Sequence, residues 1–209
     1  MRRRDPNITG LTRKTAPAAA FLADADVHGH LRLPMTGSPP APVDADLVAA
    51  YVAAAEAHLD GANGVLGRAL VTQAWEMTLA RFPRPGQHFI EVPLPPLQDV
   101  TSITYVNEAG QTQALSASTY HVIEDATGPA RIVLAYGKTW PATRCQAEAV
   151  TITFTAGYGN TPADVPAPLR AAGLLMVADM YEHREAQVAG VSIADNVTVQ
   201  RLLAPYRMG

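Results

Sequence analysis

Two groups of residues have the types and the spacing that could support chemistry. Cys145 stands directly after Arg144, and a thiolate beside a guanidinium is the arrangement of an activated cysteine nucleophile. Asp179, Glu182 and His183 share one face if their segment is helical, because positions three and four apart are neighbours on a helix. Carboxylate and imidazole groups in such a triplet are possible metal ligands.

Neither group carries the further residues that its chemistry requires. No signature of a cysteine–histidine enzyme surrounds Cys145, and the helical triplet lacks the His-Glu-x-x-His spacing of zinc enzymes. The evenly spaced Gly61, Gly64 and Gly67 match neither phosphate-binding pattern, and no serine occupies a Gly-x-Ser-x-Gly turn. We therefore expect no catalytic residue, no cofactor site and no metal site. A small hydrolase that uses Cys145 or the triplet is the weakest alternative.

The composition is that of a globular protein without a disulfide framework. The chain has 209 residues, 48% of them hydrophobic, and its single cysteine excludes an internal disulfide. The sequence has no apolar run long enough for a transmembrane helix and no signal-peptide pattern at its start. We expect a protein made in the cytoplasm, with no membrane partner.

Charge is unevenly distributed along the chain. The first fourteen residues hold five basic side chains and one acidic one, a net charge of +4, whereas the whole chain is −3, so the remainder sums to −7. An acidic body argues against a folded nucleic-acid-binding face. It also offers a surface of opposite sign to the start of the chain. We expect the basic residues there to lie along an acidic protein surface: Arg2, Arg3, Arg4, Arg13 and Lys14.

Residues 165–185 are predicted to form one long helix around which the rest of the chain is arranged. Pro166 and Pro168 suit its first turn, where a missing N–H group costs nothing, and no proline follows. Two apolar stripes run along the segment, where an ordinary surface helix has one. One stripe comprises Leu169, Ala172, Gly173, Met176 and Met180, and the other comprises Leu174, Val177, Ala178 and Tyr181. Two stripes indicate burial against the chain's own core and against a partner, although a central helix of a monomer gives the same pattern.

Shorter helices are predicted before residue 73, and strands after it. Residues 21–33 and 65–72 form short helical pieces, and residues 44–60 form an amphipathic helix with Asp44 as its N-cap. The pattern then changes to short alternating segments between turns, as in an antiparallel sheet, sandwich or barrel. The predicted strands are residues 75–82, 89–92, 100–106, 113–115, 120–123, 132–135 and 150–156, with a hairpin turn at 107–110.

The order of these elements predicts an α+β fold with segregated helices and strands. Residues 21–72 and 163–186 form a helical bundle, and residues 73–162 form a small antiparallel β domain inserted between them. Residues 1–20 are a basic leader without periodicity, and residues 187–209 are a C-terminal tail. Both ends are expected to be extended.

The C-terminal tail carries apolar side chains with little nearby sequence to bury them. A peptide of this kind gains affinity by filling pockets on a partner. We expect it to dock through apolar anchors with arginines as a polar rim. The docking residues are Val197, Val199, Arg201, Leu202, Leu203, Tyr206 and Arg207.

Seven strings follow one another along residues 21–207: HLRLP (30–34), WEMTLARFP (75–83), IEVPLPPLQDVTSITYVNEAG (90–110), TWP (139–141), AVTITFTAGYG (149–159), VPAPLRAAGLLMVADMYEHRE (165–185) and LLAPYR (202–207). Their order and spacing resemble those of the head–tail connector, or adaptor, proteins of tailed phages and phage-like gene transfer agents. The leader departs from that pattern, because it is longer and more basic.

The resemblance implies a structural subunit and not an enzyme. Such adaptors form a ring of about a dozen subunits beneath the portal, which joins the DNA-filled head to the tail and extends the DNA channel. The implied partners are the portal protein, a tail-side connector or stopper protein, and DNA that passes without sequence-specific binding. The implied location is the head–tail junction of a virion or phage-like particle assembled in the bacterial cytoplasm.

In a ring, the second side of the long helix would become a subunit interface. The candidate interface residues are Leu169 of the first stripe and Leu174, Val177 and Tyr181 of the second, and which stripe faces the neighbour stays open. The tail would dock on the portal or on a neighbouring subunit, and the leader would lie along a neighbour. A β-sandwich binding module, as in a tail or adhesion protein, is the main alternative.

Overall fold

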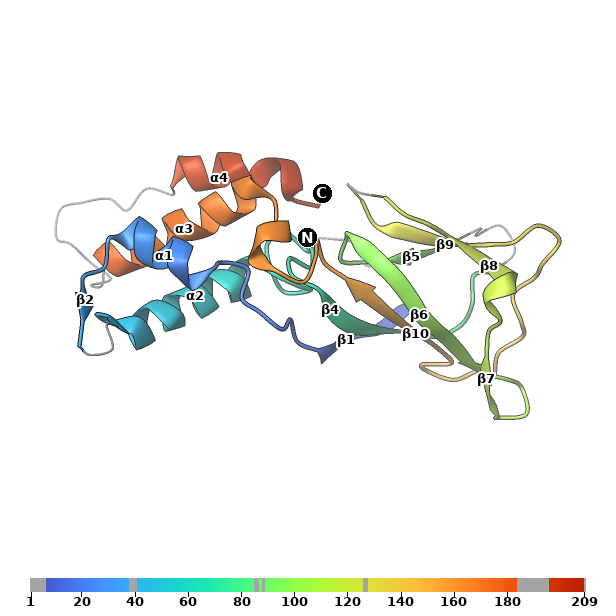
Figure 1. Cartoon of the computed structure of the whole chain (residues 1–209). Helices are drawn as coiled ribbons and strands as arrows, with labels where there is room; N and C mark the ends of the chain where they lie inside the picture. Colours follow the sequence, from blue (N-terminus) through green and yellow to red (C-terminus); the bar gives the residue numbers. More distant parts are fainter. Residues whose placement is uncertain are drawn as a thin grey trace.

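In the computed structural model, the helices and the two larger sheets occupy opposite ends of the molecule (Figure 1). The structure describes residues 7–37, 41–84, 87, 89–125, 128–183 and 196–208. The chain is thus a mixed α and β protein with antiparallel sheets, as predicted. The bundle arrangement predicted for the helices remains a prediction.

One helix lies at the centre of the helical end. The helices are α1 (Asp24–Leu31), α2 (Ala45–Leu59), α3 (Ala167–Glu182) and α4 (Val197–Leu203), with short 3-10 turns at Ala117–Thr119, Pro162–Asp164 and Ala204–Tyr206. α3 packs against the other three helices. A two-stranded ladder of β2 (Met35–Thr36) and β3 (Ala41–Pro42) joins α1 to α2. Among the described residues, no helix combines the length and the apolar composition needed to cross a bilayer.

The prolines set the start of α3. Pro166 is its N-cap, and the Pro166 carbonyl accepts from the N–H groups of Leu169 and Arg170 at 2.9 and 3.2 Å. The preceding turn is closed by Asp164, whose Oδ2 accepts from the backbone N–H and the hydroxyl of Thr161. The predicted helix therefore exists but begins two residues later than expected, and residues beyond 183 of its expected range lie outside the described part.

The helices share one hydrophobic cluster. Its most deeply buried members, each no more than 1% exposed, include Phe21, Leu59, Leu169, Val177 and Leu203. Gly173 of α3 permits the close approach of Phe21, because a Cβ atom at this position would lie 2.5 Å from the Phe21 ring. The helical core thus joins residues from both ends of the sequence.

The strands form two antiparallel sheets over a second core. The five-stranded sheet has the order β1 (Ile8–Thr15), β4 (Gln73–Leu79), β10 (Val150–Ala156), β6 (Leu97–Val106) and β7 (Thr112–Ala114), and the three-stranded sheet has the order β5 (Phe89–Val92), β9 (Ala130–Leu134) and β8 (Tyr120–Ile123). Side chains alternate along each strand, so Met77 and Ile152 of the larger sheet meet Val92 and Ile132 of the smaller one in a single cluster.

Three features of the fold correct the expectations from sequence. The leader is not irregular throughout, because β1 pairs with β4 from Ile8↔Leu79 to Thr15↔Ala74 as an edge strand of the larger sheet. Residues 65–72 are not helical; they form turns and two isolated parallel bridges, Asp60↔Arg68 and Val71↔Gly159. Asp44 does precede α2, but its side chain makes no cap hydrogen bond. The other predicted strands and the 107–110 turn are present within a few residues of their expected bounds.

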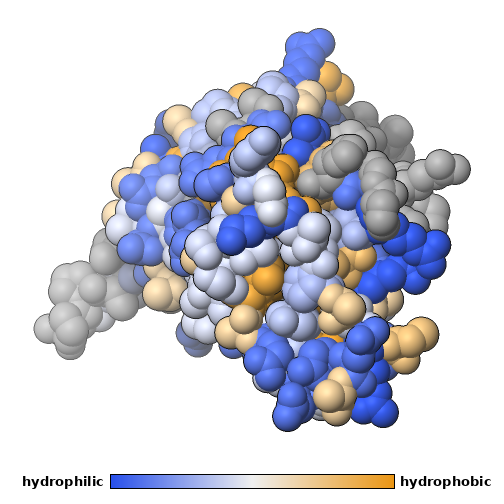
Figure 2. All heavy atoms as spheres, turned by 90° about the vertical axis from the view of Figure 1, so that its right-hand side faces the viewer, coloured by the Kyte–Doolittle hydropathy of each residue, from blue (hydrophilic) through white to orange (hydrophobic). Residues whose placement is uncertain are grey.

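The far end of the β region is mainly polar on its surface. Figure 2 shows this end, with polar atoms over most of it and apolar atoms between them. One aromatic side chain is fully exposed, that of Tyr136 in the turn after β9, where Lys138 N donates to Ala135 O at 3.0 Å.

Candidate functional site

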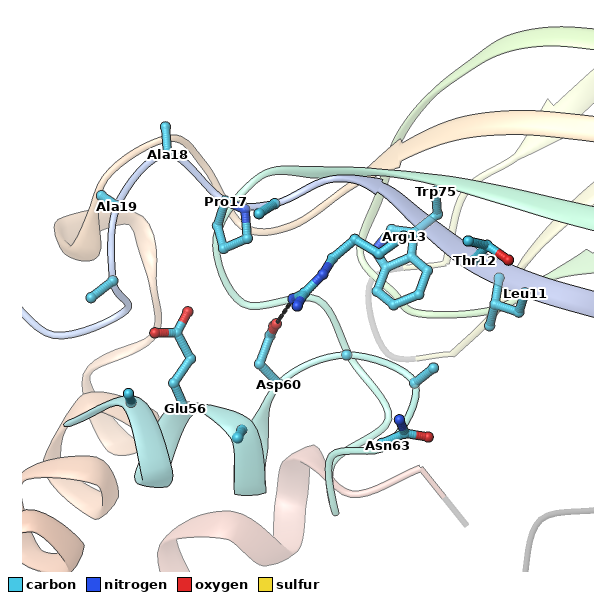
Figure 3. A pocket seen from close by; sticks show the side chains of 16 residues that line it. Leu11, Thr12, Arg13, Pro17, Ala18, Ala19, Glu56, Asp60, Asn63 and Trp75 are labelled. Atoms are coloured by element: carbon cyan, nitrogen blue, oxygen red, sulfur yellow. Dashed lines mark ion pairs between the residues drawn. The ribbon is translucent and has the colours of Figure 1, made fainter. Parts of the chain in front are cut away.

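A groove of about 940 Å³ lies between the C-terminal half of α2 and the segment that carries β1 into α1 (Figure 3). Figure 3 shows the carboxylate of Glu56, from α2, pointing toward Ala18 and Ala19 on the other wall, and the carboxylate of Asp60, directly after α2, pointing toward Arg13. The groove is lined by Leu11, Thr12, Arg13, residues 16–20, Ala53, Glu56, Ala57, residues 60–63 and Trp75. It is therefore built by elements from both cores.

Asp60 anchors the inner end of this groove. It is 8% exposed, and its Oδ1 accepts from Leu70 N at 2.7 Å. Gln73 Nε2 donates to both carboxylate oxygens at 3.0 Å, and Arg13 Nη1 lies 3.6 Å from Oδ2. Burial raises the pKa of Asp60 despite these hydrogen bonds and the nearby guanidinium. The carboxylate thus ties α2, the segment after it and β1 together.

Glu56 lies one helical turn before Asp60 and is partly buried beside it. Burial, with a smaller contribution from the Asp60 carboxylate, raises the pKa of Glu56 from 4.5 to about 7, and Arg13 opposes the shift. Among the described residues no cation forms an ion pair with Glu56. The groove therefore contains a carboxylate whose charge is only weakly compensated.

The walls of the groove consist mainly of small side chains. Alanines occupy the outward positions of α2 on both sides of Glu56, and further alanines flank Pro17 on the facing segment. Ala53 and Ala57 of α2 line the groove, and the same helix exposes Ala49, Ala50 and Ala54 outside it. Trp75 lines the groove at 5% exposure, and its indole Nε1 has no hydrogen-bond partner within the described residues. The groove has room for larger side chains from a partner.

α4 forms the opposite flank of the helical end, because α3 lies between α4 and α2 (Figure 1). Val199 and Leu203 point into the core at 6% and 1% exposure, whereas Val197 is 56% exposed. Arg201 and Ala204 are exposed at four and seven positions after Val197, so the three residues share one outward face.

The C-terminal segment is therefore part of the fold, and the expectation that it lacks local cover is wrong. Asn196 Oδ1 accepts from the N–H groups of Thr198 and Val199 at 3.2 and 3.3 Å and caps α4. Arg68 Nε donates to Tyr206 O at 2.6 Å, and Met208 N donates to Leu66 O at 3.3 Å. Residues 187–195 of the expected tail lie outside the described part.

The remaining predicted docking residues differ in exposure. Leu202 and Tyr206 are half-buried against the helical core. Arg207 is exposed, and its Nη2 donates to Gln200 Oε1 at 2.5 Å. Val199 and Leu203 are buried in the helical core of their own chain. Val197, Arg201 and Arg207 are therefore the predicted docking residues that remain exposed to a partner.

The structure also divides the predicted interface residues of α3. Leu169 and Val177 are fully buried in the helical core, so in this conformation neither reaches a neighbouring subunit. Leu174 is partly exposed in a shallow groove of about 420 Å³. Tyr181 is partly exposed and its hydroxyl donates to Asp44 Oδ2 at 3.2 Å. A role of Leu174 and Tyr181 in an interface stays a prediction.

The described basic residues of the leader contact their own chain. Arg13 pairs with Asp60, and its guanidinium carbon lies 5.9 Å from the centroid of the Trp75 ring. Lys14 Nζ lies 3.3 Å from Glu76 Oε1 on the adjacent strand. Arg2, Arg3 and Arg4 lie outside the described residues.

The residues first considered for chemistry are not assembled into a site. Cys145 is exposed. Asp179 Oδ1 and His183 Nδ1 lie 3.3 Å apart on the surface, and Glu182 is exposed beside them. The part of the chain that the structure describes contains no group of three potential metal ligands. The 940 Å³ groove, in contrast, has a partly buried carboxylate between small side chains, and this geometry suits the binding of a partner by charge and shape.

The sequence contained a signal for this groove that was not used. Glu56 and Asp60 are four positions apart at the end of a helix whose other outward residues are largely alanine. Such a helix shows few charges to solvent, and the two carboxylates share one face. The sequence does not show which residues face them, because the segment of β1 lacks the alternating pattern of a buried strand.

Comparisons with known proteins identify the fold. No protein-family model and no curated protein matches the chain. Among solved structures, a chain from "Neck of empty GTA particle computed with C6 symmetry" has a TM-score of 0.76 and 27% identity, covering 96% of both chains. A chain from "Virion of native gene transfer agent (GTA) particle" has a TM-score of 0.69 and 26% identity, covering 95% of both. A chain from "Neck of native GTA particle computed with C12 symmetry" has a TM-score of 0.67 and 25% identity, covering 96% of both.

These similarities extend over nearly the whole length of each chain, so they concern the complete arrangement of helices and sheets. The similar chains come from structures of gene transfer agent particles, two of them described as necks. The findings support a structural component of a phage-like particle and fit a role without catalysis.

Proposed function

We propose that this chain is the adaptor subunit of a phage-like neck. In this proposal twelve copies form a ring beneath the portal, join the DNA-filled head to the tail and extend the DNA channel. The observation that carries the proposal is the match to a neck chain at a TM-score of 0.76 over 96% of both chains. The C6 and C12 symmetries named for the similar necks support a ring.

The charge of the chain supports a passive channel. The sequence outside the first fourteen residues sums to −7, and a surface of this sign does not hold DNA phosphates. DNA is therefore a passing cargo, without sequence-specific contacts. The protein partners are the portal on the head side and a connector or stopper protein on the tail side.

The exposed residues of the C-terminal segment are available for these contacts. Val197, Arg201 and Arg207 would meet the portal or a neighbouring subunit, while Val199 and Leu203 hold α4 to its own core. Repetition around a ring multiplies weak single contacts into a stable joint.

The test is the mass of the assembled species, measured by native mass spectrometry on the purified chain alone and after mixing with the portal of the same particle. We expect a ring of twelve subunits in at least one sample, and co-sedimentation with portal. A chain that stays monomeric in both samples and does not sediment with portal contradicts the proposal. Electron microscopy of the neck provides an independent check of the subunit's place.

A further inference from the structure

The helical end has two different surfaces on opposite sides of α3. On one side, the 940 Å³ groove beside α2 contains Glu56 between alanine walls. On the other side, Val197 and Arg201 of α4 and the following residue, Ala204, face solvent. A closed ring is built by a head-to-tail contact, in which one surface of a subunit meets a different surface of the next. Two complementary surfaces on opposite flanks meet that requirement.

We propose that the groove beside α2 receives the exposed face of α4 from a second copy of this chain, with Arg201 of that copy paired to Glu56. The inference rests on the proposed ring and names the contact that closes it. The partner is the chain itself, and the site needs no other ligand.

Charge supports the pairing. Within the described residues neither Glu56 nor Arg201 has an ion-pair partner in its own chain, while Arg13 is already paired with Asp60. A guanidinium that enters the groove would meet a partly buried carboxylate, and such charge-assisted hydrogen bonds are stronger than those between neutral groups. The Arg201 guanidinium of the second copy would then balance the charge of the Glu56 carboxylate, which Arg13 of its own chain balances only weakly.

Shape supports the pairing as well. Val197 in α4 and Ala204, its helical C-cap residue, flank Arg201, and this face is about 10 Å long at about 1.5 Å per residue. Ala53 and Ala57 flank Glu56 in the groove, and their small side chains allow a second helix to approach closely. The valine and the stem of the arginine would cover the exposed alanines.

Disulfide trapping tests the geometry. Ala53→Cys is combined with Val197→Cys in one variant and with Ala204→Cys in a second, both carrying Cys145→Ser. α2 and α4 lie on opposite sides of α3, so either new disulfide must join two subunits. With Arg201 at Glu56, one orientation of α4 brings Val197 close to Ala53 and the opposite orientation brings Ala204 close. We expect a ladder of linked oligomers on non-reducing gels for one of the two variants.

Charge reversal tests the recognition. Arg201→Glu changes an exposed side chain, so the subunit should keep its fold. The protein concentration needed for ring assembly should rise by about tenfold or more, which corresponds to about 1.4 kcal/mol. Combining it with Glu56→Arg should restore most of the loss. Lys138→Glu makes the same change of charge in the exposed turn after β9 and should assemble like the wild type.

The outcomes separate this inference from the proposed function. Wild-type rings without crosslinks in either cysteine variant, or an Arg201→Glu variant that assembles normally, overturn the contact and leave the adaptor role standing. An equal loss for Lys138→Glu also overturns it, because the effect would then reflect overall charge. A wild-type chain that forms no ring alone or with portal contradicts both.

Discussion

The Asp60 side chain, at the end of α2, contacts two other segments: the turn region that leads into β4, and β1. Its carboxylate accepts from Leu70 N and from Gln73 Nε2 and lies 3.6 Å from Arg13 of β1. The first two donors are buried with it, whereas the Arg13 side chain is 46% exposed. Hydrogen bonds that leave buried donors unsatisfied when lost are worth more than a partly solvated ion pair.

Asp60→Ala should therefore lower the free energy of unfolding by about 1–3 kcal/mol, because the buried Leu70 N loses its acceptor and Gln73 Nε2 keeps only the Val71 carbonyl. Arg13→Ala removes the ion pair, the contact with Trp75 and a 3.5 Å hydrogen bond to Gln73 Oε1, all made by a partly exposed side chain, and should cost about 0.2–1 kcal/mol. Urea denaturation of both variants provides the measurement. Equal losses would show that the ion pair, not the buried hydrogen bonds, supports the junction.

Glu56 makes the stability of the isolated subunit depend on pH. Its pKa is about 7 in the folded chain and 4.5 in an unfolded chain, so the folded state keeps this proton to a higher pH. The contribution of Glu56 to stability is then complete below about pH 4.5 and is lost as the pH rises to about 7. Asp60 and Arg13 are the charged groups nearest to it.

Glu56→Gln removes this dependence. The variant should lose less stability than the wild type between pH 4.5 and pH 7, and should be the more stable of the two above pH 7. Denaturation curves at several pH values, measured at concentrations where the protein is monomeric, provide the measurement. Glu182→Gln, at the exposed end of α3, is the control and should follow the wild type. Parallel curves for all three proteins would contradict the assignment.

At the scale of elements, α4 illustrates how an apolar sequence is divided between a core and a surface. Leu203 is 1% exposed against α3, and Val197 on the same short helix is 56% exposed. The two residues are both aliphatic, so only their placement distinguishes them.

Leu203→Ala should lower the free energy of unfolding by about 2–5 kcal/mol, because it leaves a cavity in the helical core. Val197→Ala should change it by no more than about 0.5 kcal/mol. Thermal melting of the two variants, with circular dichroism to confirm the helix content, tests the assignment. A melting temperature unchanged by Leu203→Ala would mean that α4 does not belong to the core.

Much of the β region could be predicted because its strands alternate. Residues 75–79 and 150–156 place every second side chain in the core, and the period of two is visible in the sequence. β1 could not be predicted in the same way. Its sequence ITGLTRKT has only two large apolar residues, and five of its eight residues are exposed at the edge of the sheet. Pairing with a strand some sixty residues later stabilises β1, and that partner is not visible locally.

Two other errors have a physical origin in burial. Residues 66–71, Arg68 among them, are all buried between the two cores, so their sequence shows no period that would distinguish a helix from an extended segment. In α4 and α3 the sequence identified apolar positions correctly. It could not show whether Val199, Leu203 or Val177 faces the chain itself or a partner, because both surfaces require the same residue types.

For the whole molecule, substitutions in the two apolar stripes of α3 should affect folding and assembly separately. Leu169→Asp places a charge in the closed helical core and should cost about 3–5 kcal/mol, enough to unfold many subunits. Leu174→Asp changes a partly exposed position beside α1 and should leave the monomer folded while weakening ring assembly. Circular dichroism and native mass spectrometry of both variants separate folding from assembly. A Leu174→Asp ring of normal yield would show that this side of α3 contacts no neighbour.

The split helical core also determines the order in which a subunit can be completed on the ribosome. The β core consists mainly of residues 69–156, which leave the ribosome consecutively and can close while the rest is still being made. Phe21 and Leu59 cannot complete their packing until Leu169 and Leu203 have been translated, more than a hundred codons later. α4 is made after every helix that it packs against. A nascent chain or a prematurely terminated fragment therefore lacks both a closed helical core and the α4 face, and in the proposed ring it could not offer that face to the groove of a neighbouring subunit.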